Sequence, residues 1–173
     1  MRENGIETAR LEAMDNSKLI DIVKNHRQYG YDDALRNTAL AILETRGIQQ
    51  DELKLTGNFS NYRYDKAADL AKAFFVNSRR TFIFYAISIL VPAFYIIIPI
   101  PIQLFIICYL LSVILFCVFL IKSLISRNDF YKAIHKELGS GDYLIYLMTG
   151  ISIYLFMYFY YKNEIKEELK GMN

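Results

Sequence analysis

Charge is missing from the whole middle of this chain. No Asp, Glu, Lys, Arg or His occurs between Thr81 and Ile121, although 22% of the 173 residues are charged. Residues 1–80 hold 13 of the 20 Lys and Arg and 12 of the 18 Asp and Glu. A charged side chain costs about 2.5–3.5 kcal/mol at the centre of a bilayer, so hydrocarbon surroundings explain such an exclusion. The sequence therefore predicts an integral membrane protein.

Cysteine is also scarce, because the chain contains only Cys108 and Cys117, and both lie inside the uncharged run. On one helix these two residues occupy nearly opposite faces, so they cannot pair with each other. We therefore expect two free, buried thiols rather than a disulfide framework.

Sequence motifs of catalysis and metal binding are absent as well. The chain contains no P-loop, GxGxxG, HExxH or CxxC motif. Its long apolar segments lack the Asp, Glu, His, Lys or Arg that an intramembrane protease or a proton relay requires. A net charge of +2 gives nucleic acid no electrostatic attraction. We predict no catalytic, cofactor-binding or metal-binding residue, no cofactor and no nucleic-acid partner, and we predict that the protein is not an enzyme.

Proline is rare, with three copies, and two of them interrupt the apolar stretch IIIPIPIQLF. Pro99 and Pro101 separate residues 81–98 from residues 102–121. At about 1.5 Å per residue, each of these segments reaches about 27–30 Å, the thickness of a hydrocarbon core. Proline lacks a backbone donor and clashes with the preceding turn, so the pair ends one helix and lets the next begin. The pattern predicts a hairpin of two spans joined by a turn at residues 99–101.

A third uncharged segment covers residues 143–161. Asp142 follows a Gly-Ser-Gly break and is expected to cap a helix there. The segment ends in the run YFYY, which is typical of the aromatic belt at a membrane interface. We predict a third span, followed by a tail at residues 162–173, within a transmembrane domain that covers residues 79–173.

Basic residues near the span ends indicate the orientation. By the positive-inside rule, the N-terminal region and residues 122–142 lie in the cytosol and the proline turn lies outside. Residues 122–142 form either an extension of the second span or a helix on the lipid headgroups. The third span would carry the tail outside, whereas a re-entrant or interfacial third segment would leave it inside. The residues that determine this topology are Arg79, Arg80, Pro99, Pro101, Lys122 and Arg127.

Residues 1–78 show helical periodicity without a strand pattern and predict a cytosolic helical head. The first 15 residues contain no apolar signal-peptide core, so we expect the N-terminus to stay in the cytosol. Ser17 and Asp32 are expected to cap two helices, and Gly47 and Gly57 are expected to end two.

The last predicted head helix, residues 61–78, carries the most regular apolar face in the chain. We favour packing of this face on the other head helices, and the alternative is a surface that binds a partner. The candidate interaction face consists of Tyr64, Ala67, Ala68, Ala71, Phe74 and Phe75.

One stretch of the head, LIDIVKNHRQYGYDDALRNTALAILETRGI at residues 19–48, resembles a known pattern. It is similar to a short helical module near the N-terminus of uncharacterised small polytopic membrane proteins of bacteria. The alanine register, with Ala34, Ala39 and Ala41, departs from that pattern. The resemblance implies a bacterial inner-membrane setting and implies no catalytic or binding residue. It is carried by Leu19, Ile22, Val23, Asn25, Tyr31, Leu43, Arg46, Gly47 and Ile48.

The predicted fold is all-α, with about three transmembrane helices and a cytosolic N-terminal head in the cell (inner) membrane. We predict a non-catalytic binding or regulatory protein, such as an accessory subunit or an immunity-type protein that recognises a membrane or cytosolic protein. The alternative is an oligomeric pore-forming or membrane-perturbing protein. A pore needs a polar stripe along a helix face, and residues 102–121 offer only Gln103 and Ser112. The expected partners are the lipid bilayer and either another protein or further copies of this chain.

Overall fold

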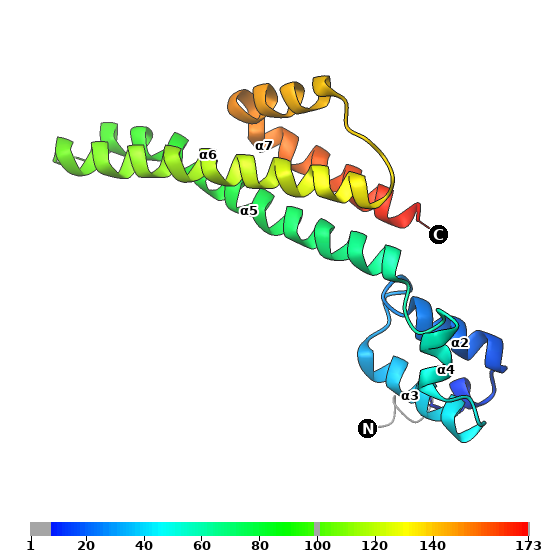
Figure 1. Ribbon diagram of the computed structural model, residues 1–173. Coiled ribbons are helices and arrows are strands. Elements are labelled where there is room, and N and C mark those ends of the chain that lie inside the picture. The colour runs from blue at the N-terminus through cyan, green and yellow to red at the C-terminus, as the bar shows by residue number, and fades with distance from the viewer. Residues whose placement is uncertain (1–7, 99–100, 173) are drawn as a thin grey trace. The chain divides into compact units, whose positions relative to one another are not determined.

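The computed structural model describes residues 8–98 and 101–172. Within these ranges the chain is helical and has no strand, which confirms the all-α prediction. The chain divides into two compact units, one that ends at Asp65 and one that covers Lys66–Met172. In chain order the helices are α2 (Asn16–Asn25), α3 (Asp33–Thr45), α4 (Gln50–Leu55), α5 (Tyr62–Ile97), α6 (Ile102–Ala133) and α7 (Ser140–Lys170) (Figure 1).

Aspartates cap the first two helices of the N-terminal unit. The Asp15 carboxylate accepts a hydrogen bond from the backbone N–H of Lys18 (2.8 Å), and this bond lowers the pKa of Asp15. The prediction that Ser17 caps α2 is wrong, because the helix begins two residues earlier than that cap requires and Asp15 supplies an equally good cap. The Asp32 carboxylate accepts from the N–H of Leu35 (2.9 Å), which confirms Asp32 as the cap of α3.

Two glycines end the following helices as predicted. Gly47 and Gly57 have φ of 88° and 71°, in the left-handed region that a side chain disfavours. Beyond them the chain closes each helix end with a backbone bond, from Ile48 N to Leu43 O (3.0 Å) and from Asn58 N to Leu53 O (2.8 Å). These bonds satisfy carbonyls that the helix ends leave unpaired.

The N-terminal unit has a hydrophobic core of its own. Leu19 and Val23 of α2 and Leu43 of α3 are fully buried there. Burying a leucine or valine side chain contributes about 1.5–3 kcal/mol, so this small core holds the short helices together. The buried core residues are Leu11, Leu19, Ile22, Val23, Ala39, Leu40, Leu43 and Leu53.

Helix α5 is continuous, so the predicted head helix at 61–78 and the predicted span at 81–98 form one helix. The connecting residues, Arg79 and Arg80, are neither glycine nor proline, so nothing ends the helix there. Ser78 and Thr81 are 1% and 0% exposed, and both face the packed interior of the second unit. Pro92 lies inside the helix and does not end it.

The two units divide within the first turns of α5, between Asp65 and Lys66, rather than between residues 78 and 79. The physical reason lies in Ala67, Ala71 and Phe74, which are at most 1% exposed. These side chains belong to the hydrophobic core that α6 and α7 also build. From Ala67 onward, the predicted 61–78 helix therefore packs with the long helices, whereas its first residues, up to Asp65, belong to the N-terminal unit.

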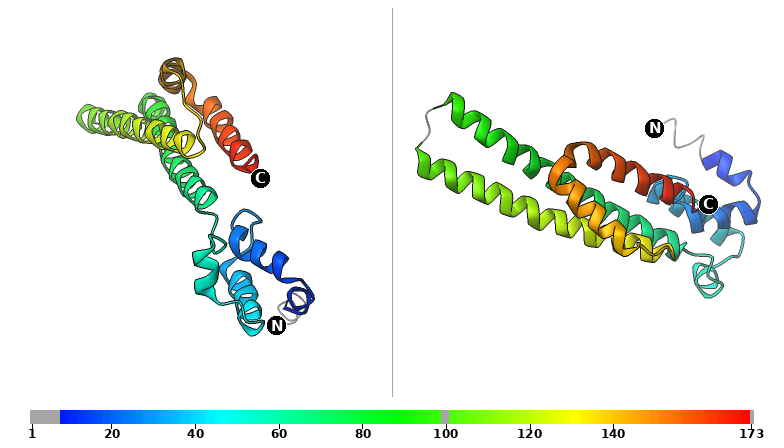
Figure 2. Two further views of the ribbon diagram at one scale, coloured as in Figure 1. Left: turned by 45° about the vertical axis from the view of Figure 1, so that its right-hand side comes forward. Right: turned by 90° about the horizontal axis from the view of Figure 1, so that it is seen from above.

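Helices α5 and α6 form an antiparallel pair (Figures 1 and 2). The rings of Tyr95 and Phe105 stack with centroids 4.3 Å apart, and those of Phe84 and Phe119 stack at 5.6 Å. Helix α6 begins after Pro101, as predicted, while Pro99 lies outside the described residues. The helix continues to Ala133, so the segment after residue 121 begins as an extension of α6.

Helix α7 has the length and composition of a membrane span, as α5 and α6 do. Its backbone breaks at Ile153, where φ is −140° and ψ is 35°. The ring centroids of Tyr146 and Tyr161 are 4.5 Å apart, whereas a straight helix would separate the two residues by about 22 Å. The helix therefore consists of a first arm (140–152) and a second arm (154–170) that doubles back beside it (Figure 1).

The predicted third span, residues 143–161, lies within α7, and the backbone of this segment breaks at Ile153. Tyrosines on both arms are buried rather than turned to the surroundings. Tyr146 and Tyr154 are 0% exposed, and Tyr161 is 3% exposed. Packing of these large rings between helices outweighs the cost of breaking the helix at one residue.

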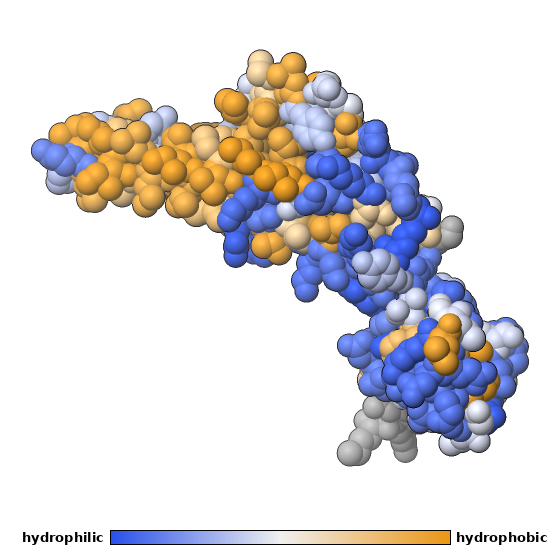
Figure 3. Space-filling model, in the orientation of Figure 1, coloured by the Kyte–Doolittle hydropathy of each residue, from blue (hydrophilic) through white to orange (hydrophobic). Residues whose placement is uncertain are grey.

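Apolar side chains cover the outside of the α5–α6 pair. Exposed fractions reach 51% for Phe94, 62% for Ile107 and 58% for Ile114. On the face drawn in Figure 3, hydrophobic residues dominate the left part of this pair, where the N-terminal half of α6 lies. A water-exposed apolar surface of this extent is unusual for a soluble monomer and indicates contact with lipid or protein.

Candidate functional site

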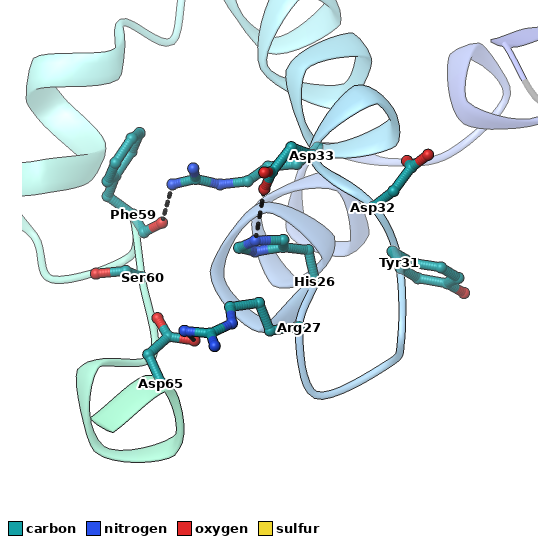
Figure 4. A pocket seen from close by; sticks show the side chains of 9 residues that line it. His26, Arg27, Tyr31, Asp32, Asp33, Phe59, Ser60 and Asp65 are labelled. Carbon is teal, nitrogen blue, oxygen red and sulfur yellow. Dashed lines mark hydrogen bonds and ion pairs between the residues drawn. The ribbon is translucent and has the colours of Figure 1, made fainter. Parts of the chain in front are cut away.

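The N-terminal unit contains an open polar cavity of about 720 Å³. The end of α2, the start of α3, the loop before α5 and the first turn of α5 supply its walls (Figure 4). Its lining residues are His26, Arg27, Tyr31, Asp32, Asp33, Arg36, Phe59, Ser60 and Asp65.

His26 forms the buried floor of this cavity, with 4% of its surface exposed. Its Nδ1 lies 3.3 Å from the carbonyl oxygen of Val23, and its Nε2 lies 3.4 Å from Oδ1 of Asp33. Figure 4 shows the imidazole directed at the Asp33 carboxylate. Because the Asp33 side chain is 87% exposed, it presents negative charge at the mouth of the cavity.

Two arginines balance the carboxylates of the cavity. Arg27 Nη1 lies 3.5 Å from Oδ1 of Asp65. Arg36 donates from Nη2 to the carbonyl oxygen of Phe59 (2.9 Å), and its guanidinium lies 4.2 Å from the centre of the Phe59 ring. The cavity thus offers adjacent positive and negative groups, a pattern suited to a polar or charged surface of a partner.

The same residues do not assemble a metal site. Among residues 8–98 and 101–172, no three His, Cys, Asp or Glu side chains are grouped closely enough to hold a metal ion.

A second polar cluster lies in the long-helix unit, around Arg127 of α6. Arg127 is 4% exposed, and its Nη2 donates to both carboxylate oxygens of Glu164 (2.9 and 3.1 Å). The hydroxyl of Tyr131 donates to Oε1 of the same carboxylate (2.5 Å). The guanidinium lies 4.8–5.7 Å from the ring centres of Tyr131, Tyr146 and Tyr161. Ion pairing and cation–π contacts together compensate for burying this charge.

Hydroxyl pairs extend the cluster between the helices. Ser123 Oγ and the hydroxyl of Tyr146 are 2.8 Å apart, and Ser78 Oγ and the hydroxyl of Tyr154 are 2.7 Å apart. The first pair joins the first arm of α7 to α6. The second pair joins Tyr154, at the apex of α7 next to Ile153, to α5. These two pairs satisfy the four hydroxyls inside the unit, whereas Nε of Arg127 is buried without a hydrogen-bond partner among the described residues.

Sequence reasoning missed the role of Arg127, which we predicted only as a topology determinant. Glu164 falls within the predicted tail, residues 162–173. One signal was present, since Ser123, Arg127 and Tyr131 recur every four residues and so share one face of α6. Nothing in the sequence connects that face to Glu164, because the two elements meet only after α7 doubles back.

The other predicted topology residues lie on the surface. Arg79, Arg80 and Lys122 are exposed. The guanidinium of Arg80 and the ammonium of Lys122 lie 5.4 and 5.7 Å from the centre of one ring, that of Phe119. Two basic residues from α5 and α6 therefore meet at the same level of the hairpin.

The structure buries three residues of the predicted interaction face and leaves the other three half-buried. Ala67, Ala71 and Phe74 are buried in the core of the second unit and are not accessible to a partner. Tyr64, Ala68 and Phe75 are half-buried. The stripe is used chiefly for packing within this chain.

Comparison of the chain with protein-family models, with curated proteins and with solved structures finds no match.

Proposed function

We propose that this protein is a multi-pass protein of the bacterial inner membrane that acts as a non-catalytic binding or regulatory subunit. The observation that best supports this proposal is that Arg80 and Lys122 both lie beside the ring of Phe119, so they mark one level along the α5–α6 pair. Beyond that level, neither α5 nor α6 carries a charge. Residues 81–97 and 102–121 then provide about 26 and 30 Å of helix, close to one hydrocarbon thickness.

The basic residues at this level set the proposed orientation. Arg79, Arg80 and Lys122 lie at one end of the hairpin, and the other end is uncharged. The positive-inside rule then places this end, and the N-terminal unit connected to it, in the cytosol.

The binding role rests on the N-terminal unit. That unit has its own core and a charged cavity, so it presents a recognition surface whose lining residues all precede the uncharged part of the long helices. An accessory subunit or an immunity-type protein would use such a surface to bind a membrane or cytosolic protein.

The experiment that tests this role compares two charge reversals. Asp33 and Asp51 both lie in the first turn of a helix, and their side chains are 87% and 88% exposed. Only Asp33 lines the cavity. Full-length wild-type protein, Asp33→Lys and Asp51→Lys are crosslinked in native membranes, and the captured proteins are compared.

A partner that wild type and Asp51→Lys retain and Asp33→Lys loses supports the proposal. Equal capture by all three proteins would remove the cavity from the binding role. Complete extraction of the protein by alkaline carbonate would remove the membrane assignment.

The pore alternative receives less support. Ser112, Ser123 and Arg127 are buried within the unit, so the exposed faces of α6 offer mainly apolar groups to a neighbouring copy. A water-filled channel requires a polar lining. We expect purified protein to give no unitary currents in planar bilayers, and reproducible currents would restore this alternative.

A further inference from the structure

The two arms of α7 begin and end beside the same end of the α5–α6 hairpin. At the start of the first arm, the hydroxyl of Tyr143 donates to Oδ1 of Asn128. At the end of the second arm, Lys136 Nζ donates to Oε2 of Glu168 (2.6 Å). Both contacts involve α6 or the residues that follow it, beyond Lys122 and outside the apolar part of the hairpin.

The apex of α7 reaches only a limited depth along the hairpin. Gly150 packs against Leu120, and the ring of Tyr154 lies 6.3 Å from that of Phe116. Phe116 precedes Lys122 by six residues, which corresponds to about 9 Å of helix. Half of the hydrocarbon core is about 15 Å thick. The described contacts of α7 therefore stay within one half of the hairpin's apolar length.

One backbone carbonyl beside the break in α7 has a hydrogen-bond partner on another helix. The backbone carbonyl of Ser152, next to Ile153, accepts a hydrogen bond from the hydroxyl of Tyr85 on α5 (2.9 Å). In hydrocarbon an unpaired carbonyl costs several kcal/mol, so non-helical backbone is tolerated only where protein groups satisfy it. Tyr85 supplies such a group at the point where the chain reverses.

We propose that α7 is a re-entrant hairpin that enters and leaves one leaflet from the side on which Arg80 and Lys122 lie. The C-terminal tail is then on the cytosolic side, opposite to the side predicted for an unbroken third span. The lipid acyl chains of that single leaflet are the partner of its outer apolar face, which includes Leu144, Ile145, Met148, Ile151, Phe156 and Phe159. This inference rests on the proposed membrane location.

Charge favours this path over an unbroken span. Residues 162–170 carry three lysines and three glutamates, all of which would have to cross the hydrocarbon to place the tail outside. In the re-entrant path, Glu164 pairs with Arg127 and Glu168 pairs with Lys136. An unbroken span would also separate Arg127 from the carboxylate of Glu164.

The test labels single cysteines in a full-length chain in which Cys108 and Cys117 are replaced by alanine. The positions are Gln103→Cys at the far end of the hairpin, Lys132→Cys in the last turn of α6 and Lys166→Cys on the second arm, and all three residues are exposed. A membrane-impermeant maleimide is applied to sealed inside-out vesicles and to spheroplasts. We expect Lys132→Cys and Lys166→Cys to react only from the cytosolic face, and Gln103→Cys only from the opposite face.

Labelling of Lys166→Cys from the same face as Gln103→Cys would overturn the re-entrant path and leave the membrane location intact. Equal labelling of all three positions from both faces would overturn the membrane location and this inference together. As a second readout, a short bis-maleimide should join the pair Lys136→Cys and Glu168→Cys in native membranes. It should not join Lys136→Cys and Gln103→Cys. Failure of the first pair to crosslink would contradict the doubled-back arrangement.

Discussion

Arg127 and Glu164, 37 residues apart in the chain, form a buried ion pair in which one guanidinium nitrogen donates to both carboxylate oxygens. The pair joins α6 to the second arm of α7, and Tyr131 adds a third hydrogen bond to the same carboxylate. The side chains of Arg127 and Glu164 are 5% and 26% exposed, so water screens the pair only in part.

Replacing Glu164 with glutamine should destabilise the folded protein. Removing one partner of a buried ion pair costs about 3–5 kcal/mol, and the partial exposure of Glu164 places the expected loss near the lower end, about 3 kcal/mol. The measurement is denaturant unfolding in mild detergent micelles, followed by circular dichroism. Glu167→Gln is the matched control, because the Lys170–Glu167 pair is 72% and 70% exposed and should contribute less than about 1 kcal/mol. Equal losses for both variants would refute a special role for the buried pair.

Gly150→Ala should loosen the contact between the first arm of α7 and α6. A Cβ at this position would lie 2.8 Å from Cδ1 of Leu120, which is itself buried. Overpacking of this kind costs about 1–3 kcal/mol. Gly141→Ala in the same helix meets no atom within 4 Å and should be neutral or slightly stabilising. In a Leu120→Ala background, the cost of Gly150→Ala should disappear, and a persistent cost would show that Leu120 is not its cause.

Tyr85→Phe should weaken the apex of α7. The substitution keeps the ring and removes the hydroxyl that pairs with the Ser152 carbonyl, at an expected cost of about 1–3 kcal/mol. Hydrogen–deuterium exchange of peptides that cover residues 150–156 should rise. Tyr95→Phe is the control, since the Tyr95 ring stacks on Phe105 and its hydroxyl has no hydrogen-bond partner among the described residues. Unchanged exchange in Tyr85→Phe would argue against this hydroxyl as the group that satisfies the break.

Asp32→Ala should destabilise the start of α3. The Asp32 carboxylate accepts from the N–H of Leu35, and loss of such a cap costs about 1 kcal/mol. Amide exchange across residues 33–45 of the full chain should then accelerate about five-fold. Asp32→Asn caps equally well and should exchange like the wild type. Faster amide exchange in both variants would show that the charge of Asp32, rather than its capping hydrogen bond, stabilises the start of α3.

Much of the local structure could be predicted from short-range patterns. The capping role of Asp32 and the positive φ of Gly47 and Gly57 depend on backbone groups only a few residues away. The start of α6 after Pro101 follows from the geometry of proline itself. The uncharged run likewise predicted apolar helices of bilayer length.

The continuity of α5 and the path of α7 could not be predicted in this way. Ile153 is neither glycine nor proline, and it lies in a segment whose composition matches a membrane span. Its break depends on Tyr85 and on the packing of Tyr146 against Tyr161, contacts between residues that no local pattern relates.

By itself, the sequence determined that this protein is helical, where its apolar segments lie and where several helices begin and end. Each of these properties depends on the solvent preference of a side chain or on hydrogen bonds within a single turn. Only the tertiary structure decided that α7 reverses and that Arg127 meets Glu164. Those outcomes depend on which distant surfaces bury their tyrosines and satisfy their polar groups together.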